Sequence, residues 1–206
     1  MPDRTPPPPE RPAPVARPLL LAEQLALVAM RPATRRRPVG TRAQLNACLA
    51  ALLLAELQLD DRPPTDPVLD AAAEIARERG PRPRSVLSHM DRGLAQRTGL
   101  GTWELLTSRL DEERLAGRDE LISRLQHAAA SDDPLDVRTQ LLLSFAGPAQ
   151  LLEVVAPQRR GRRHARARID RGLEGTVFEE LRRVVRRLLS DDAAAAVVAS
   201  TAAVSG

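Results

Sequence analysis

The pattern of apolar residues along the chain predicts helices almost throughout. Leucines recur at spacings of three and four between Thr41 and Leu57, which marks one face of a helix, and apolar residues fill most other positions of this segment. The Thr41 hydroxyl suits the start of such a helix. We therefore predict a buried central helix here. Residues 19–30 are apolar without a clean period, and we favour a short helix over a strand.

Capping and helix-breaking residues divide the rest of the chain. An Asp-Pro pair suits a helix start, because the aspartate accepts from free amides and the proline needs no partner; such pairs occur at Asp66 and Asp133. Ser85 is expected to cap a helix that ends before Gly99, and Thr102 to begin one that ends at the acidic run 111–113. Further helices are predicted at 67–79, around 121–125, and at 135–145, 151–155, 158–169 and 177–189.

Composition points to an all-α fold built as a single compact multi-helical domain around the central helix. The 206 residues can bury one sizeable core, and with one Trp, two Phe and no Tyr the packing must come from aliphatic side chains. The Pro-rich residues 1–18 are predicted to be a disordered tail, residues 19–190 the helical domain, and residues 191–206 an Ala/Val-rich C-terminal tail.

The sequence also indicates where the protein works. Cys48 is the single cysteine, so no intramolecular disulfide can form and a reducing, cytoplasmic location is expected, with Cys48 as inert packing. No leader is recognised before residue 19. The longest apolar run, residues 45–55, is far short of the ~20 residues that span a bilayer.

Charge is unevenly distributed along the chain. Residues 158–187 hold eleven arginines against four acids, whereas residues 41–157 hold thirteen against eighteen. Residues 1–40 hold seven arginines against three acids, so the acidic middle is flanked by basic ends, a pattern that suggests an anionic partner.

Three stretches together resemble the Golgi phosphoprotein 3 family. They are LNACLAALLLAELQL at 45–59, PPTDPVLDAAAEIARE at 63–78, and DPLDVRTQLLLSFAGPAQLLEVVAPQRRGRRHARARI at 133–169. The chain looks like a shortened bacterial member. The resemblance implies an all-helical peripheral domain that recognises phosphatidylinositol 4-phosphate in eukaryotes and presses a short apolar hairpin into the bilayer.

The chain departs from the family where the headgroup binds. The family's pocket uses one Trp and three Arg, and an ungapped alignment puts these positions at Thr41, Ala50, Leu100 and Trp103. Two segments also look deleted: a strand-forming stretch before the Thr-Asp-Pro element, and most of the hairpin region between Gly117 and Asp133. The headgroup pocket therefore does not carry over by sequence.

An arginine cluster after Pro157 is the strongest candidate binding feature. Each arginine near an anionic leaflet can contribute about 1 kcal/mol, although the same cluster also fits a solvated helix whose charges meet the acidic middle. Trp103 aligns with Leu106 and Leu110, which favours a core position over a lipid interface. The candidate lipid-headgroup residues are Arg159, Arg160, Arg162, Arg163, Arg166, Arg168 and Trp103.

The expected function is that of a peripheral membrane-associated protein that binds phosphoinositides or other anionic lipids. A helical protein–protein adaptor is the alternative. A nucleic-acid regulator is less favoured, because the middle is acidic and no aromatic residue lies among the arginines. Catalysis is not expected, and neither a cofactor nor a metal is predicted, since His89, His127 and His164 lack metal-site spacing and phosphate-loop motifs are missing.

Overall fold

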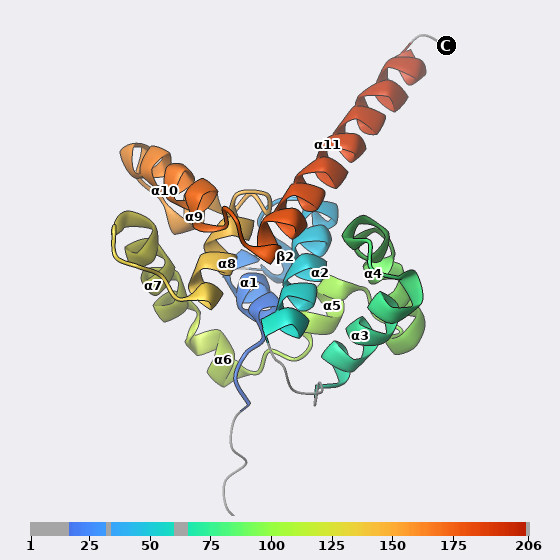
Figure 1. Cartoon of the computed structure of the whole chain (residues 1–206), viewed down its shortest axis with the longest axis horizontal. Coiled ribbons are helices and arrows are strands. Elements are labelled where there is room, and N and C mark those ends of the chain that lie inside the picture. Colours follow the sequence, from blue (N-terminus) through green and yellow to red (C-terminus); the bar gives the residue numbers. More distant parts are fainter. Residues whose placement is uncertain (1–16, 32–33, 60–65, 205–206) are drawn as a thin grey trace, which may run out of the picture.

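Figure 1 shows the computed structural model, which describes residues 17–31, 34–59 and 66–204. Its described part holds eleven helices and one pair of short antiparallel strands. In chain order these are α1 Leu21–Ala29, β1 Met30–Arg31, β2 Thr34–Pro38, α2 Arg42–Leu59, α3 Pro67–Arg79, α4 Pro83–Thr98, α5 Thr102–Thr107, α6 Glu112–Ala116, α7 Arg118–Ala130, α8 Val137–Ala146, α9 Leu152–Val155, α10 Arg159–Gly172 and α11 Val177–Val204.

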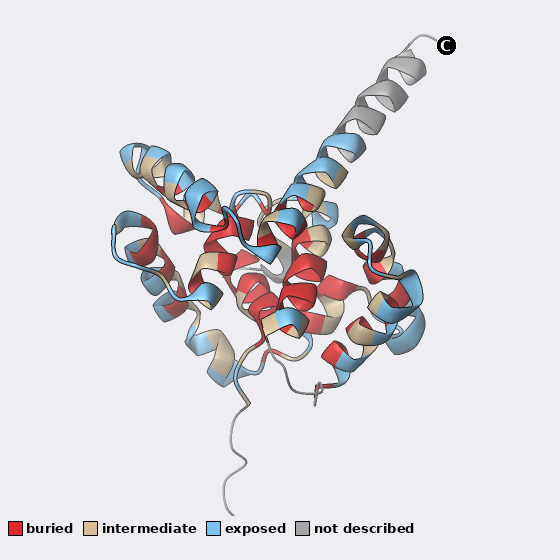
Figure 2. Cartoon of the chain, in the orientation of Figure 1, coloured by how far each residue is buried: buried red, intermediate tan, exposed pale blue. Residues whose placement is uncertain are grey.

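Helix α2 is the centre of the molecule, as its apolar pattern predicts. It packs against α1, α3, α4, α5, α8 and α11. Leu45, Leu49, Leu52 and Leu53 are fully buried along it, and Figure 2 shows this buried layer through the middle of the body. Cys48 is buried beside them, and burial raises the pKa of its thiol well above the usual value. The all-α prediction is confirmed, with the strand pair as a minor addition.

Helix α1 is almost entirely buried, and two buried glutamates bind its first amides. The Glu23 carboxylate accepts from the amide of Leu20 at 3.0 Å, and Glu56 of α2 accepts from the amide of Leu21 at 2.7 Å. Arg138 of α8 donates to the same Glu56 at 2.5 Å. These contacts fix α1 against α2 and α8, because helix-start amides without partners would be costly in the core.

Several predicted boundaries were wrong for local reasons. Helix α4 begins at Pro83, two residues before Ser85, since proline fits a first turn. Helix α5 ends at Thr107, and Asp111 caps the separate helix α6. Helix α8 begins at Val137 with Asp136 as its cap, so the pair at Asp133 does not start it.

Helices α7, α10 and α11 extend further than their apolar patterns predict. The predicted boundary at residue 190 falls inside α11, which continues to Val204. Of the predicted N-terminal tail, residues 1–16 lie outside the described part of the chain. Among the described residues, none of the helices has the length and apolarity required to cross a bilayer.

Candidate functional site: the basic face of α10

Helix α10 is held on the body by a narrow apolar stripe. Ala165 and Ile169 of the helix, together with Leu173 after its end, are buried, and the helix packs against α7 and α8. The other positions are mostly arginine. The helix therefore lies along the edge of the body (Figure 1), and Figure 2 shows that much of it is exposed.

Four of the six predicted arginines share that outer surface. Positions 159, 163 and 166 follow helical spacing along one line, with position 160 beside it. Among the residues whose side chains the structure describes, 17–31, 38–59 and 66–191, none of the four makes an ion pair or a side-chain hydrogen bond. We call this surface the basic face; its residues are Arg159, Arg160, Arg163 and Arg166.

The other two predicted arginines hold the helix in place. Arg162 pairs with Glu153 at 2.7 Å and donates to the carbonyls of Ala156 and Pro157, both at 3.1 Å. Arg168 donates to the carbonyl of Asp133 in the loop before α8. Both side chains therefore have partners in the fold.

Trp103 is not at the surface. Its side chain is 2% exposed in α5, inside the same core as Leu106. The helical alignment that favoured a core position is confirmed, and in this structure the ring has no face toward a lipid.

An open groove of about 770 Å³ separates α10 from α11. Arg166 lines it from α10 and Arg186 from α11, and Arg186 pairs across it with Asp170 at 2.8 Å. Its other wall is formed by the start of α2 and the turn between α8 and α9, through Gln44 and Gln150. We call this the α10–α11 groove. Sequence reasoning missed it because its walls come from segments far apart in the chain.

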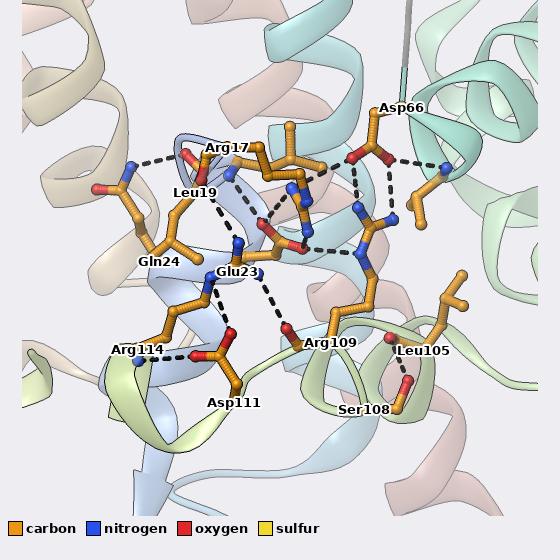
Figure 3. Close-up of polar contacts among 12 residues, drawn as sticks. Arg17, Leu19, Glu23, Gln24, Asp66, Leu105, Ser108, Arg109, Asp111 and Arg114 are labelled. Atoms are coloured by element: carbon orange, nitrogen blue, oxygen red, sulfur yellow. Dashed lines mark hydrogen bonds and ion pairs between the residues drawn. The ribbon is translucent and has the colours of Figure 1, made fainter. Parts of the chain in front are cut away.

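A second charged cluster lies near the start of the described chain (Figure 3). Glu23, which is fully buried, pairs with Arg17 at 2.5 Å and with Arg109 at 3.0 Å. Asp66 accepts from Arg109 at 2.8 Å, from the amide of Val68 at 2.9 Å, and pairs with Arg17 at 3.2 Å. Every carboxylate in the cluster has arginine partners, so it joins α1, α3 and the end of α5 and offers little free charge to a ligand.

A model of the family described as Golgi phosphoprotein 3 (GPP34) matches residues 21–204, which is most of the chain. The chain belongs to the Golgi phosphoprotein 3 family. Searches of curated proteins and of solved structures found no match. The match covers the helical body of this Golgi phosphoprotein 3 family member. Its candidate binding site follows from the positions and partners of its own charged residues.

At the family's headgroup positions this member has little that binds an anion. Ala50 and Trp103 are buried, and neither side chain carries a charge. Beside Thr41, the nearby Arg42 is paired with Glu104 of α5 at 2.5 Å. In the region where the family's hairpin was expected, residues 118–130 form helix α7. The basic face is the stronger candidate site for an anionic surface.

Proposed function

We propose that this Golgi phosphoprotein 3 family member docks peripherally onto anionic membrane surfaces through the basic face. The observation that carries the proposal is the group of four exposed guanidinium groups on one helix, without carboxylate partners among the described residues. At about 1 kcal/mol for each arginine near an anionic leaflet, they supply several kcal/mol. That is enough for reversible adsorption.

Membership of the family also supports docking onto anionic membranes. It is known for peripheral Golgi proteins that bind phosphatidylinositol 4-phosphate, and it is generally non-enzymatic. In this chain the positions of the family's pocket carry other residues, whereas the basic face is open. We infer adsorption to anionic lipids on the cytoplasmic side, driven by charge more than by one headgroup.

Co-sedimentation with vesicles tests the proposal. The wild type is mixed with neutral phosphatidylcholine vesicles and with vesicles containing phosphatidylglycerol or a phosphoinositide, across a salt series. The test variant is Arg159→Ala/Arg160→Ala/Arg163→Ala, which leaves the groove residue Arg166 in place. Because three arginines are lost, we expect binding to anionic vesicles to fall roughly 100-fold at low salt. Salt should abolish wild-type binding, since it screens exposed charges.

The matched control is Arg77→Ala/Arg79→Ala/Arg82→Ala. It removes the same charge from exposed positions on and beside α3, far from α10 in Figure 1. The control should bind within about threefold of the wild type, because adsorption depends on local charge. Equal losses in both variants would mean that net charge alone drives binding. Failure of the wild type to bind any vesicle would refute the proposal and favour a protein–protein adaptor, and equal retention on duplex DNA would favour a nucleic-acid binder.

A further inference from the structure

The α10–α11 groove has a built polar wall. Arg162, Arg166 and Asp170 line it from successive turns of α10, four residues apart. Arg162 is held by Glu153 and Arg186 by Asp170, at 2.7 and 2.8 Å. Arg166 has no such partner among the described residues. Among the described residues, the groove thus holds one guanidinium without a carboxylate partner, between two ion pairs.

The charges in the groove favour one class of anion. Among the described side chains that line it are three arginines and two carboxylates, an excess of one positive charge. The buried Arg182, which is not part of the lining, also pairs with Asp170 at 3.2 Å. A phosphodiester carries one negative charge and matches this excess, whereas a dianionic phosphomonoester would meet repulsion from Asp170 and Glu153. The same carboxylates accept hydrogen bonds from hydroxyl groups. A phosphodiester with a hydroxylated headgroup therefore offers a partner to Arg166 and to both carboxylates of the groove.

The side-chain amide of Gln150 can donate and accept hydrogen bonds without carrying a charge, and the backbone of this residue is in an unfavourable conformation. Its φ is 60°, and it is the single non-glycine residue with positive φ in the described chain. It ends the turn after α8, where its amide donates to Gly147 at 3.0 Å and the amide of Leu151 donates to Ala146 at 2.7 Å. This pattern is a Schellman motif, whose left-handed position usually holds glycine.

The Gln150 side chain lines the groove beside Gly40. A Cβ added at Gly40 would lie 3.3 Å from Oε1 of Gln150, so the glycine leaves room for this amide. A side chain that lines a groove from an unfavourable backbone conformation is consistent with a binding role.

We propose that the α10–α11 groove binds the headgroup of a singly charged, hydroxylated phosphodiester lipid such as phosphatidylglycerol. The phosphate lies at Arg166, and the headgroup hydroxyls lie between Asp170, Glu153 and Gln150. This site adds a headgroup preference to the proposed docking function. It rests on that function, because docking brings the groove to the membrane surface. It also differs from the headgroup pocket that the family resemblance implies.

Titration of soluble headgroups into ¹⁵N-labelled protein at fixed ionic strength tests the groove without a membrane. The probes are glycerophosphoglycerol, a diester, and glycerol 3-phosphate, a monoester. We expect the diester to shift backbone signals around Gln150, Arg166 and Arg186 and to bind more tightly than the monoester. Arg166→Ala should weaken diester binding about tenfold, since a charge-assisted hydrogen bond is lost.

Gln150→Gly is the decisive variant. Glycine fits a left-handed position, so the variant should unfold at no lower urea concentration than the wild type while binding the diester about threefold more weakly. The matched control for Arg166→Ala is Arg171→Ala, which removes one exposed charge from α10 outside the groove. Its affinity for the diester should stay within twofold of wild type. Equal shifts by both probes, or unchanged binding in Gln150→Gly, overturns the proposed ligand class.

Vesicles separate the two proposals. At equal mole fractions, phosphatidylglycerol and phosphatidylserine carry the same net charge, but phosphatidylserine lacks the diol. We expect wild type to prefer phosphatidylglycerol and Gln150→Gly to lose that preference while keeping salt-sensitive adsorption. If the wild type adsorbs to vesicles without preferring phosphatidylglycerol, and the soluble diester shifts no signals of groove residues, the groove proposal is refuted and the docking proposal stands. Groove shifts by the soluble diester without vesicle binding refute the docking function and leave the groove as a small-molecule site.

Discussion

Arg182 and Arg183 are neighbours in the sequence with opposite environments. Helical spacing favours a mostly outward position for both, but Arg182 is 7% exposed. It donates to the carbonyl of Ile169 at 2.8 Å and to that of Asp170 at 3.2 Å. Its guanidinium thus binds carbonyls near the end of α10. Burial, with Arg186 nearby, lowers the pKa of Arg182. Arg183 is exposed and pairs with Glu179 at 2.7 Å within its own helix.

The two arginines should differ sharply in their effect on stability. Arg182→Ala removes a buried guanidinium that donates to two carbonyls near the end of α10, so we expect the free energy of unfolding to fall by roughly 2 kcal/mol. Arg183→Ala, the control, should change it by less than about 0.5 kcal/mol, as an exposed pair does. Urea denaturation followed by circular dichroism measures both. Equal effects would contradict the structural role of Arg182.

At the scale of elements, the start of α8 shows why Asp136, and not Asp133, caps the helix. Asp136 accepts from the amide of Thr139 at 2.9 Å, whereas Asp133 accepts from the hydroxyl of Ser131 at 2.6 Å in the loop before it. A hydrogen bond from the Thr139 side chain contributes most to holding the pKa of Asp136 below its usual value, and the Thr139 amide lowers it further. Two aspartates near a helix start look alike in sequence, and their backbone positions decide which one caps it.

Substitution of these aspartates gives a direct comparison. Asp136→Ala should lower the free energy of unfolding by about 1 kcal/mol, because α8 loses its side-chain cap. The corresponding change at Asp133 removes only an exposed loop contact and should cost less than about 0.5 kcal/mol. Chemical denaturation at pH 7 distinguishes them. A larger loss for Asp133→Ala would restore the Asp-Pro start that the sequence predicted.

At the scale of the molecule, the cluster in Figure 3 ties together segments that the sequence keeps apart. Burial alone would raise the pKa of Asp66, but hydrogen bonds from Arg109 and the Val68 amide, with Arg17 nearby, outweigh it and lower that pKa. The folded protein therefore binds this proton more weakly than the unfolded chain does. Its contribution to stability is complete above the unfolded pKa of about 3.9 and is lost as the pH falls through the lower folded value.

Acid unfolding should reveal this linkage. Asp66→Asn should be less stable than wild type at pH 7, and the difference should shrink as the pH falls below about 4, because the wild type then loses the same charge. Asp70→Asn, at an exposed position on α3, serves as control and should leave the acid profile close to that of wild type. Thermal denaturation between pH 2.5 and 7 measures the profiles. A gap between Asp66→Asn and wild type that stays constant with pH would rule out the linkage.

The sequence by itself determined the helical class, the central position of α2 and the range of α3. These follow from local rules: the 3.6-residue period of Leu45, Leu49 and Leu52, and the capping geometry of Asp66 with Pro67. The arginines of α10 were also visible as a cluster, and four of them do share one exposed face.

The tertiary structure alone decided which charges have partners and where the groove lies. The sequence left open whether the arginines of α10 have partners in the fold. Arg162, Arg168 and Arg182 each bind a carbonyl that only the packing of neighbouring segments brings within reach. The α10–α11 groove joins the turn at Gln150, α10 and α11 to the start of α2, which lies far earlier in the sequence. Helical period and caps act within one turn, whereas a binding groove depends on the relative placement of whole helices.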